Sequence, residues 1–118
     1  MYGLKKDVDL TFLQGREVIQ VAIGMYQVSF NFDENVSISV ESEFEHTSKG
    51  GSSQWRPGAP LTVGTAVNLL TATVEAVHGQ EDGTLKLTFS NGDTLLIRDT
   101  SAKYESYQIS RRGGMIIV

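Results

Sequence analysis

The side chains best suited to chemistry lie together in one short segment, E-S-E-F-E-H, from Glu41 to His46. Glu41, Glu43 and Glu45 occupy alternate positions, and alternate side chains of a strand project from one face about 7 Å apart. Carboxylate oxygens beside an imidazole could hold calcium or magnesium. A metal ion must be surrounded, however, whereas side chains on one strand all point the same way. We therefore expect no metal ion and no cofactor, and interpret the glutamates as a solvated face or as a recognition surface for a basic partner.

Catalysis by a nucleophile has little support in the sequence. A serine, threonine or lysine nucleophile needs a general base beside it and a third group that orients the base. His46 and His78 are the only imidazoles, and neither lies in a nucleophile-elbow sequence. Sequences typical of a phosphate-binding loop or a dinucleotide site are also missing. We expect both histidines to be surface or packing residues and the protein not to be an enzyme.

The acidic residues are unevenly placed along a chain whose net charge is -4. Asp33, Glu34, Glu41, Glu43 and Glu45 follow one another with no lysine or arginine between them. Affinity for nucleic acid comes mainly from lysine and arginine contacts with phosphates, so direct nucleic-acid binding is not expected. A basic protein partner is favoured instead.

Two aromatic residues are candidates for contact with that partner. Trp55 lies in a polar segment and either folds back over the core or is presented for contact. Tyr107, in the segment Y-E-S-Y, offers the same choice. Tryptophan and tyrosine are enriched among the residues that dominate binding energy. The adjacent pair Arg111-Arg112 is too small for a nucleic-acid patch and is interpreted as an ordinary turn.

The composition indicates one folded domain, residues 1–118. The 118 residues are 40% hydrophobic and 20% charged, with no cysteine, which fits a single core and a reducing cytoplasm. No apolar signal core lies near the start of the chain, and no stretch approaches the roughly 18 apolar residues of a membrane span. We therefore expect a cytoplasmic protein that does not contact a membrane.

Two-residue periodicity predicts two β-hairpins. Apolar and polar residues alternate over 26–32 and again over 36–41, on either side of a polar turn, which predicts a pair of antiparallel strands. The same pattern over 85–90 and 95–97 surrounds Asn91-Gly92, a pair that favours a turn with two positive φ values. Each hairpin follows another predicted strand, at 17–23 and 73–77, and before it a short apolar segment that could form a helical turn.

The two halves therefore have the same order of elements, which suggests an internal duplication of 9–45 and 66–99. Between them, 46–60 is rich in glycine, serine and proline and predicts a long flexible loop. A last strand pair is predicted at 104–110 and 115–118. Together these elements predict a mainly β fold: an antiparallel sandwich or a curved, partly closed sheet from two similar halves, with one or two short helical turns.

Four segments carry a resemblance to a known family: F-L-Q-G-R-E-V at 12–18, the hairpin at 27–41, F-S-N-G-D at 89–93 and Y-E-S-Y at 104–107. Over most of its length the chain resembles a small bacterial family of unknown function that is similar to the immunity proteins of contact-dependent growth inhibition and other polymorphic toxin systems. The resemblance carries over no catalytic motif and no site residue.

The resemblance implies a cytoplasmic immunity protein that neutralises a cognate toxin domain by binding it directly. A toxin nuclease would be basic, so an acidic inhibitor would be steered towards it. In this hypothesis the glutamates at 41, 43 and 45 steer the toxin together with the adjoining Asp33 and Glu34, while Trp55 and Tyr107 anchor it. The competing hypothesis is a small-ligand or divalent-metal-binding β-domain. The C-terminal strand, which ends at Val118, is a candidate edge for a homodimer.

Overall fold

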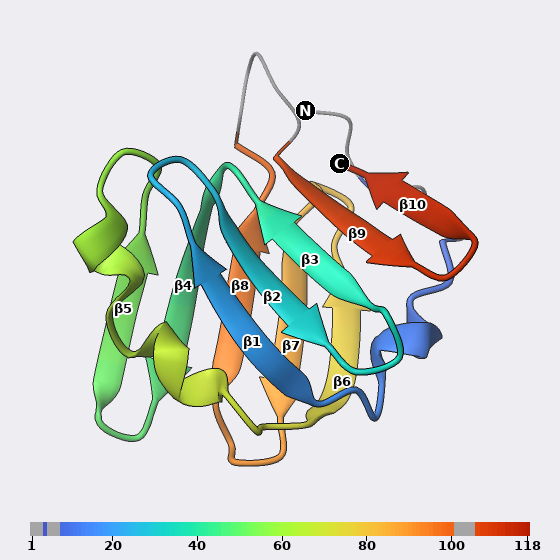
Figure 1. Cartoon of the computed structure of the whole chain (residues 1–118), viewed down its shortest axis with the longest axis horizontal. Coiled ribbons are helices and arrows are strands. Elements are labelled where there is room, and N and C mark those ends of the chain that lie inside the picture. The colour runs from blue at the N-terminus through green and yellow to red at the C-terminus, as the bar shows by residue number, and fades with distance from the viewer. Residues whose placement is uncertain (1–3, 5–7, 101–105) are drawn as a thin grey trace.

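The computed structural model describes residues 4, 8–100 and 106–118 and has two layers (Figure 1). Within the described residues, ten strands form two antiparallel five-stranded sheets. Sheet one contains, in spatial order, β1 (Val18–Ile23), β2 (Val28–Phe32), β3 (Ser37–Val40), β9 (Tyr107–Arg111) and β10 (Gly114–Ile117). Sheet two contains, in spatial order, β5 (Gly51–Trp55), β4 (Glu43–Ser48), β8 (Thr94–Arg98), β7 (Leu85–Phe89) and β6 (Val74–Gly79).

The hydrophobic core lies between the two sheets, because alternate residues of each strand point inward. Phe30 of β2 meets Phe44 of β4 edge to face, with ring centroids 5.3 Å apart. Phe44 stacks on Trp55 of β5 at 5.4 Å. The first of these aromatic pairs joins the two layers, and the second lies within sheet two. The predicted mainly β, antiparallel fold is confirmed, and neither sheet closes into a barrel.

Two short 3-10 helices cover the open sides of this sandwich. The first, η1 (Thr11–Leu13), packs beside β6, and the second, η2 (Pro60–Leu69), packs across β5 and β1. Before η1, the Asp9 carboxylate accepts hydrogen bonds from the backbone N–H of Thr11 at 2.9 Å and from its hydroxyl at 2.6 Å. These bonds lower the pKa of Asp9, with the hydroxyl bond as the largest cause. The prediction of one or two short helical turns is confirmed.

The two halves of the chain meet through reciprocal backbone contacts. The Val18 N–H donates to the Ala72 carbonyl and the Val74 N–H to the Arg16 carbonyl, both at 2.9 Å. An irregularity of register follows Val18 in β1 and, equivalently, Val74 in β6. The halves are thus related by an approximate two-fold arrangement of η1–β1–β2–β3 and η2–β6–β7–β8. Their origin by duplication stays a prediction.

The predicted flexible loop at 46–60 is wrong, because most of it forms the β4–β5 hairpin. β4 lies between β5 and β8, so both of its edges are hydrogen bonded. Its inward residues Phe44 and His46 are buried, as is Trp55 opposite. Three of the glycines and serines that suggested a loop lie on the edge strand β5, whose side chains are mostly exposed. Burial of one face therefore outweighed a composition typical of loops.

The turn between β7 and β8 has a different conformation from the one that Asn-Gly predicts. Only Gly92 has a positive φ, of 88°, and its N–H donates to the Phe89 carbonyl at 2.9 Å. The Asn91 side chain accepts the Asp93 N–H at 2.9 Å, which fixes a three-residue loop. Two successive positive φ values occur instead at Glu34 and Asn35, 59° and 60°, in the β2–β3 turn.

Candidate functional site

The structure does not bring the predicted acidic residues together. Glu43 and Glu45 lie on the outer face of β4 in sheet two, where Glu45 accepts a hydrogen bond from Gln54 Nε2 at 3.0 Å. Glu41 precedes that strand, and its backbone N–H bonds to the Ser106 carbonyl at 2.9 Å. Glu43 and Glu45 thus belong to sheet two, Glu41 lies in the connection between the sheets, and Asp33 belongs to sheet one.

Asp33 and Glu34 lie at the β2–β3 turn of sheet one. An Asp33 carboxylate oxygen accepts the Glu17 backbone N–H at 3.0 Å and lies 3.8 Å from an Arg16 guanidinium nitrogen. Glu17, Asp33 and Glu34 therefore form a small acidic group, called here the acidic rim, at the start of β1. One acidic surface made of all five predicted residues does not exist.

Trp55 and Tyr107 are not available as partner anchors, and that prediction is corrected. Both side chains have 0% relative exposure. Trp55 stacks inside the core. The Tyr107 hydroxyl donates to the Gly83 carbonyl at 2.7 Å, and burial is the main reason that the pKa of Tyr107 lies well above its ordinary value, with Asp99 and Asp82 as further causes. Alternate residues of a strand point towards the core, so an aromatic side chain at such a position is buried even where the flanking sequence is polar.

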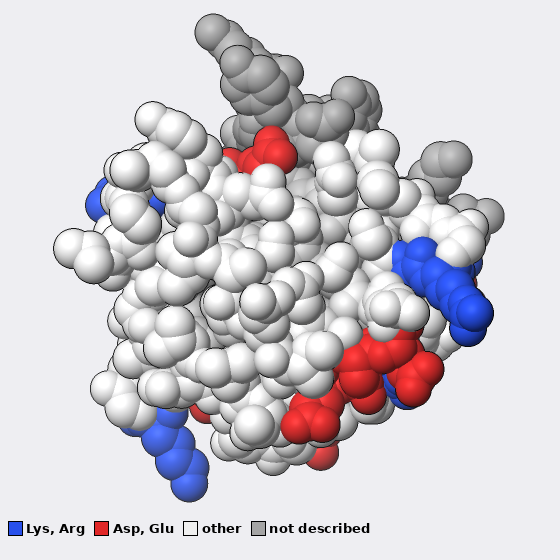
Figure 2. Space-filling model, viewed as in Figure 1, with Lys and Arg blue, Asp and Glu red and all other residues white. Residues whose placement is uncertain are grey.

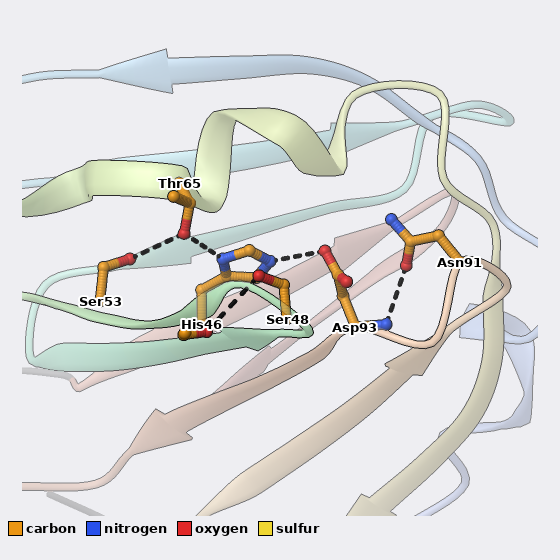
Figure 3. A network of polar contacts seen from close by, with 7 residues as sticks. His46, Ser48, Ser53, Thr65, Asn91 and Asp93 are labelled. Carbon is orange, nitrogen blue, oxygen red and sulfur yellow. Dashed lines mark hydrogen bonds and ion pairs between the residues drawn. The ribbon is translucent and has the colours of Figure 1, made fainter.

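A buried polar network centred on His46 was not predicted (Figure 3). His46 Nε2 lies 2.8 Å from an Asp93 carboxylate oxygen, and Nδ1 lies 2.8 Å from the Thr65 hydroxyl oxygen. That hydroxyl lies 3.3 Å from the Ser53 hydroxyl. The signal in the sequence was the alternation of His46 with Phe44, which places the imidazole on the inward face of β4.

The His46 network contains the groups of a catalytic triad, but its geometry fits a structural role. The imidazole has 0% exposure, so it is screened from any substrate. It connects η2, through Thr65, to the β7–β8 turn, through Asp93, and thereby holds the helix over the sandwich. His46 also points away from the neighbouring glutamates of β4. Among the described residues there is no group of three or more histidines and acids that could hold a metal ion.

The outer face of sheet one carries no charged side chain in its two paired rows, although its strands come from distant parts of the sequence. The Asn31 amide donates to Gln20 at 2.7 Å, and the Ser29 and Ser39 hydroxyls lie 3.0 Å apart. The two rows, called here the uncharged face, contain Gln20, Asn31, Ser37, Ser110 and Met115 in one and Ala22, Ser29, Ser39, Gln108 and Ile117 in the other.

The exposed large apolar side chains of the described residues lie on this face or along its border with η2. Met115 and Ile117 belong to the uncharged face. The other seven, called here the apolar border, are Ile19, Ile23, Met25, Tyr26, Leu61, Val67 and Leu70. The Thr71 N–H donates to the Val18 carbonyl, and the Gly58 N–H to the Met25 carbonyl. These bonds hold the ends of η2 beside β1 and the β1–β2 turn, so the seven residues of the border belong to neighbouring segments.

Figure 2 looks onto this side of the molecule: its centre is free of charge, and the charged side chains lie at the rim. The outer face of sheet two is different, because its paired rows include Glu43, Glu45, Lys86 and Arg98. Two sheets of the same construction thus present one charged and one uncharged surface.

These features define the class as a two-sheet antiparallel β-sandwich with a buried structural histidine network and one uncharged outer face. The chain belongs to a family of unknown function, DUF6188, whose profile matches residues 10–118. No curated protein and no solved structure matches the chain. In the part of the chain that the structure describes, no helix is long and apolar enough to cross a membrane.

Proposed function

We propose that this protein is a non-enzymatic binding domain that docks one folded protein partner on the uncharged face and the apolar border. One observation carries the proposal: of the nine exposed large apolar side chains of the described residues, seven lie in β1, the β1–β2 turn and η2 with its C-cap, and the other two lie in β10 at the opposite edge of the same sheet. Single exposed apolar residues are ordinary on a protein surface, whereas a continuous group of them marks an interaction site.

The chemistry of this surface fits a protein partner. The centre of a protein–protein interface is depleted in charge and enriched in aromatic residues and methionine, with a polar rim. Here Tyr26 and Met25 are more than half exposed, at 69% and 53%, and the charges lie at the rim. A surface for nucleic acid would need lysine and arginine at its centre.

The uncharged face is also organised before binding. Its side chains are short, and several are hydrogen bonded to each other across the strands, as are Asn31 with Gln20 and Ser29 with Ser39. Short side chains on a rigid sheet lose little conformational freedom when a partner docks. Serine and asparagine can also exchange their mutual hydrogen bonds for bonds to the partner.

The more specific proposal is that the partner is a cognate bacterial toxin domain and that the protein is its immunity protein. The net charge of -4 and the acidic rim favour a basic partner, such as a nuclease, by steering its approach. The anchoring role that the sequence suggested for Trp55 and Tyr107 passes to the exposed border residues Tyr26, Ile23 and Leu70. An inhibitor of this kind needs no catalytic group of its own.

The test is co-expression of the full chain with the C-terminal domain of the large secreted protein encoded directly upstream. We expect the chain to restore growth and to purify with that domain as a stoichiometric complex. Ile23→Lys on the apolar border should abolish both effects, whereas Ala76→Lys, on the outer face of sheet two, should preserve them. A genome with no such neighbour, or a chain that neither binds nor protects, contradicts the immunity proposal.

A further inference from the structure

A second surface, at one end of sheet one, has a chemistry that protein docking does not explain. An open cavity of about 550 Å³ is lined by Phe12, Arg16, Glu34, Val36, Arg111 and Arg112. The arginines come from three places: the segment after η1, the end of β9 and the β9–β10 turn. The adjacent pair Arg111-Arg112, interpreted from sequence as an ordinary turn, thus lines one cavity together with Arg16.

The guanidinium groups around this cavity are poorly satisfied by the protein. Arg16 Nε is buried and has no hydrogen-bond partner, and the one ion pair of Arg16, to Asp33, is long at 3.8 Å. Among the described residues, neither Arg111 nor Arg112 forms an ion pair. A guanidinium offers five N–H donors, so three of them around one cavity call for an acceptor with several oxygens.

The cavity also has an apolar wall. Val36 is buried, and the Arg111 guanidinium carbon lies 4.6 Å from the centre of the Phe12 ring. This cation–π contact orients the guanidinium before any ligand arrives. The Glu34 carboxylate completes the lining, and Asp9 and Asp33 also face these arginines. These acids lower the net positive charge of the cavity, so they favour a ligand with one anionic group over a ligand with several.

We propose that this cavity binds the phosphate group of a small phosphate monoester whose organic part packs against Phe12 and Val36. Three guanidinium groups that line one cavity from different segments match a tetrahedral group with three terminal oxygens better than a planar carboxylate with two. This site does not include the uncharged face. The phosphate proposal can therefore be tested separately from the proposed protein partner.

The test is a calorimetric titration of the full chain at neutral pH and low salt with phenyl phosphate, inorganic phosphate and benzoate. We expect saturable one-to-one binding of phenyl phosphate, weaker binding of inorganic phosphate because it lacks an apolar part, and the weakest binding for benzoate. Arg111→Gln and Arg112→Gln should each weaken phenyl phosphate binding about tenfold or more, because each removes charged hydrogen bonds.

Two further variants separate a shaped site from general attraction to positive charge. Arg16→Lys keeps the charge but removes Nε, and it should also weaken binding about tenfold. Arg56→Gln, outside the cavity, should bind phenyl phosphate as the unchanged protein does. No saturable binding, equal binding by all four variants, or benzoate bound as tightly as phenyl phosphate would each overturn the proposal. Circular dichroism of each variant verifies that it is folded.

Discussion

His46 is a fully buried imidazole with a hydrogen-bonding group at each ring nitrogen. Its carboxylate partner Asp93 takes the place in the β7–β8 turn that the buried Val36 takes in the β2–β3 turn, because the Phe89 N–H donates to the Asp93 carbonyl as the Phe32 N–H donates to the Val36 carbonyl. A buried polar group is tolerated when its hydrogen bonds are made and is costly when one of them is lost. The hydrogen-bond network is therefore present in only one half of the molecule. The stability of the fold depends on both groups that are hydrogen bonded to the His46 ring.

The contribution of this network can be measured by removing one hydroxyl. Thr65→Val keeps the shape of the side chain but leaves His46 Nδ1 without its partner, and we expect a loss of about 1–3 kcal/mol of unfolding free energy. The control is Thr47→Val, on the exposed face of β4, the strand that contains His46. This substitution should change stability by less than about 0.5 kcal/mol. Urea unfolding measures both, and equal effects would mean that the Thr65–His46 bond does not hold η2.

Tyr107 predicts a specific response to alkaline pH. Burial raises its pKa above that of the unfolded chain. Above a pH of about 10, the unfolded chain loses the phenolic proton while the folded protein keeps it, so stability falls as the pH rises. Below that pH, the phenol is neutral in both states and the contribution is constant. Tyr107→Phe should remove this part of the alkaline decline.

Urea midpoints of the two proteins between about pH 9 and 11 measure the effect. Tyr107→Phe should be less stable at neutral pH, because the Gly83 carbonyl loses its donor, and the difference between the proteins should shrink as the pH rises. Parallel curves would show that Tyr107 ionises equally easily in both states.

At the scale of elements, the sequence predicted the strands in which apolar and polar residues alternate regularly. It did not predict which strands pair with each other in the sheets. The β2–β3 and β7–β8 hairpins were predicted because short turns join strands that pair with each other. The β4–β5 hairpin was missed because β5 is an outer strand of small residues, and only the position of Trp55 reveals its inward phase. Strand β4 pairs with β8, far away in the sequence, and no local pattern predicts such pairing.

The kink in η2 at Gly64 allows the helix to pack on β5. Gly64 has φ 56° and ψ −129°, and a Cβ there would lie 2.6 Å from the Cβ of Ser53. Gly15 also has a positive φ, of 81°, but a Cβ there meets nothing within 4 Å. Both positions disfavour a side chain for backbone reasons, by about 1–3 kcal/mol. Only Gly64 adds a steric conflict.

We therefore expect Gly64→Ala to destabilise the protein by about 1–3 kcal/mol more than Gly15→Ala. Urea unfolding of the two variants measures this difference directly. Similar losses in both variants would mean that η2 moves away from β5 without cost, and that the His46–Thr65 contact adds little.

At the scale of the whole molecule, one architecture carries two unlike surfaces. Sheet two has glutamate, lysine and arginine on its outer face, whereas sheet one has serine, asparagine and glutamine at the equivalent places. The candidate site could not be predicted from sequence, because the uncharged face is assembled only when β9 pairs with β3 and places Ser110 beside Ser37. The acidic residues were visible in the sequence, but the fold divides them between two sheets.

The central claim, that a protein partner docks on the uncharged face, is tested most directly by one calorimetric comparison of two arginine substitutions. Asn31→Arg and Thr88→Arg change equivalent positions on the outer faces of β2 and β7. The arginine at 31 would bury an unpaired charge under the partner, so affinity for the toxin domain should fall at least about tenfold, whereas the arginine at 88 should change it less than about twofold. Equal affinities for both variants, or a larger loss with Thr88→Arg, would contradict the account.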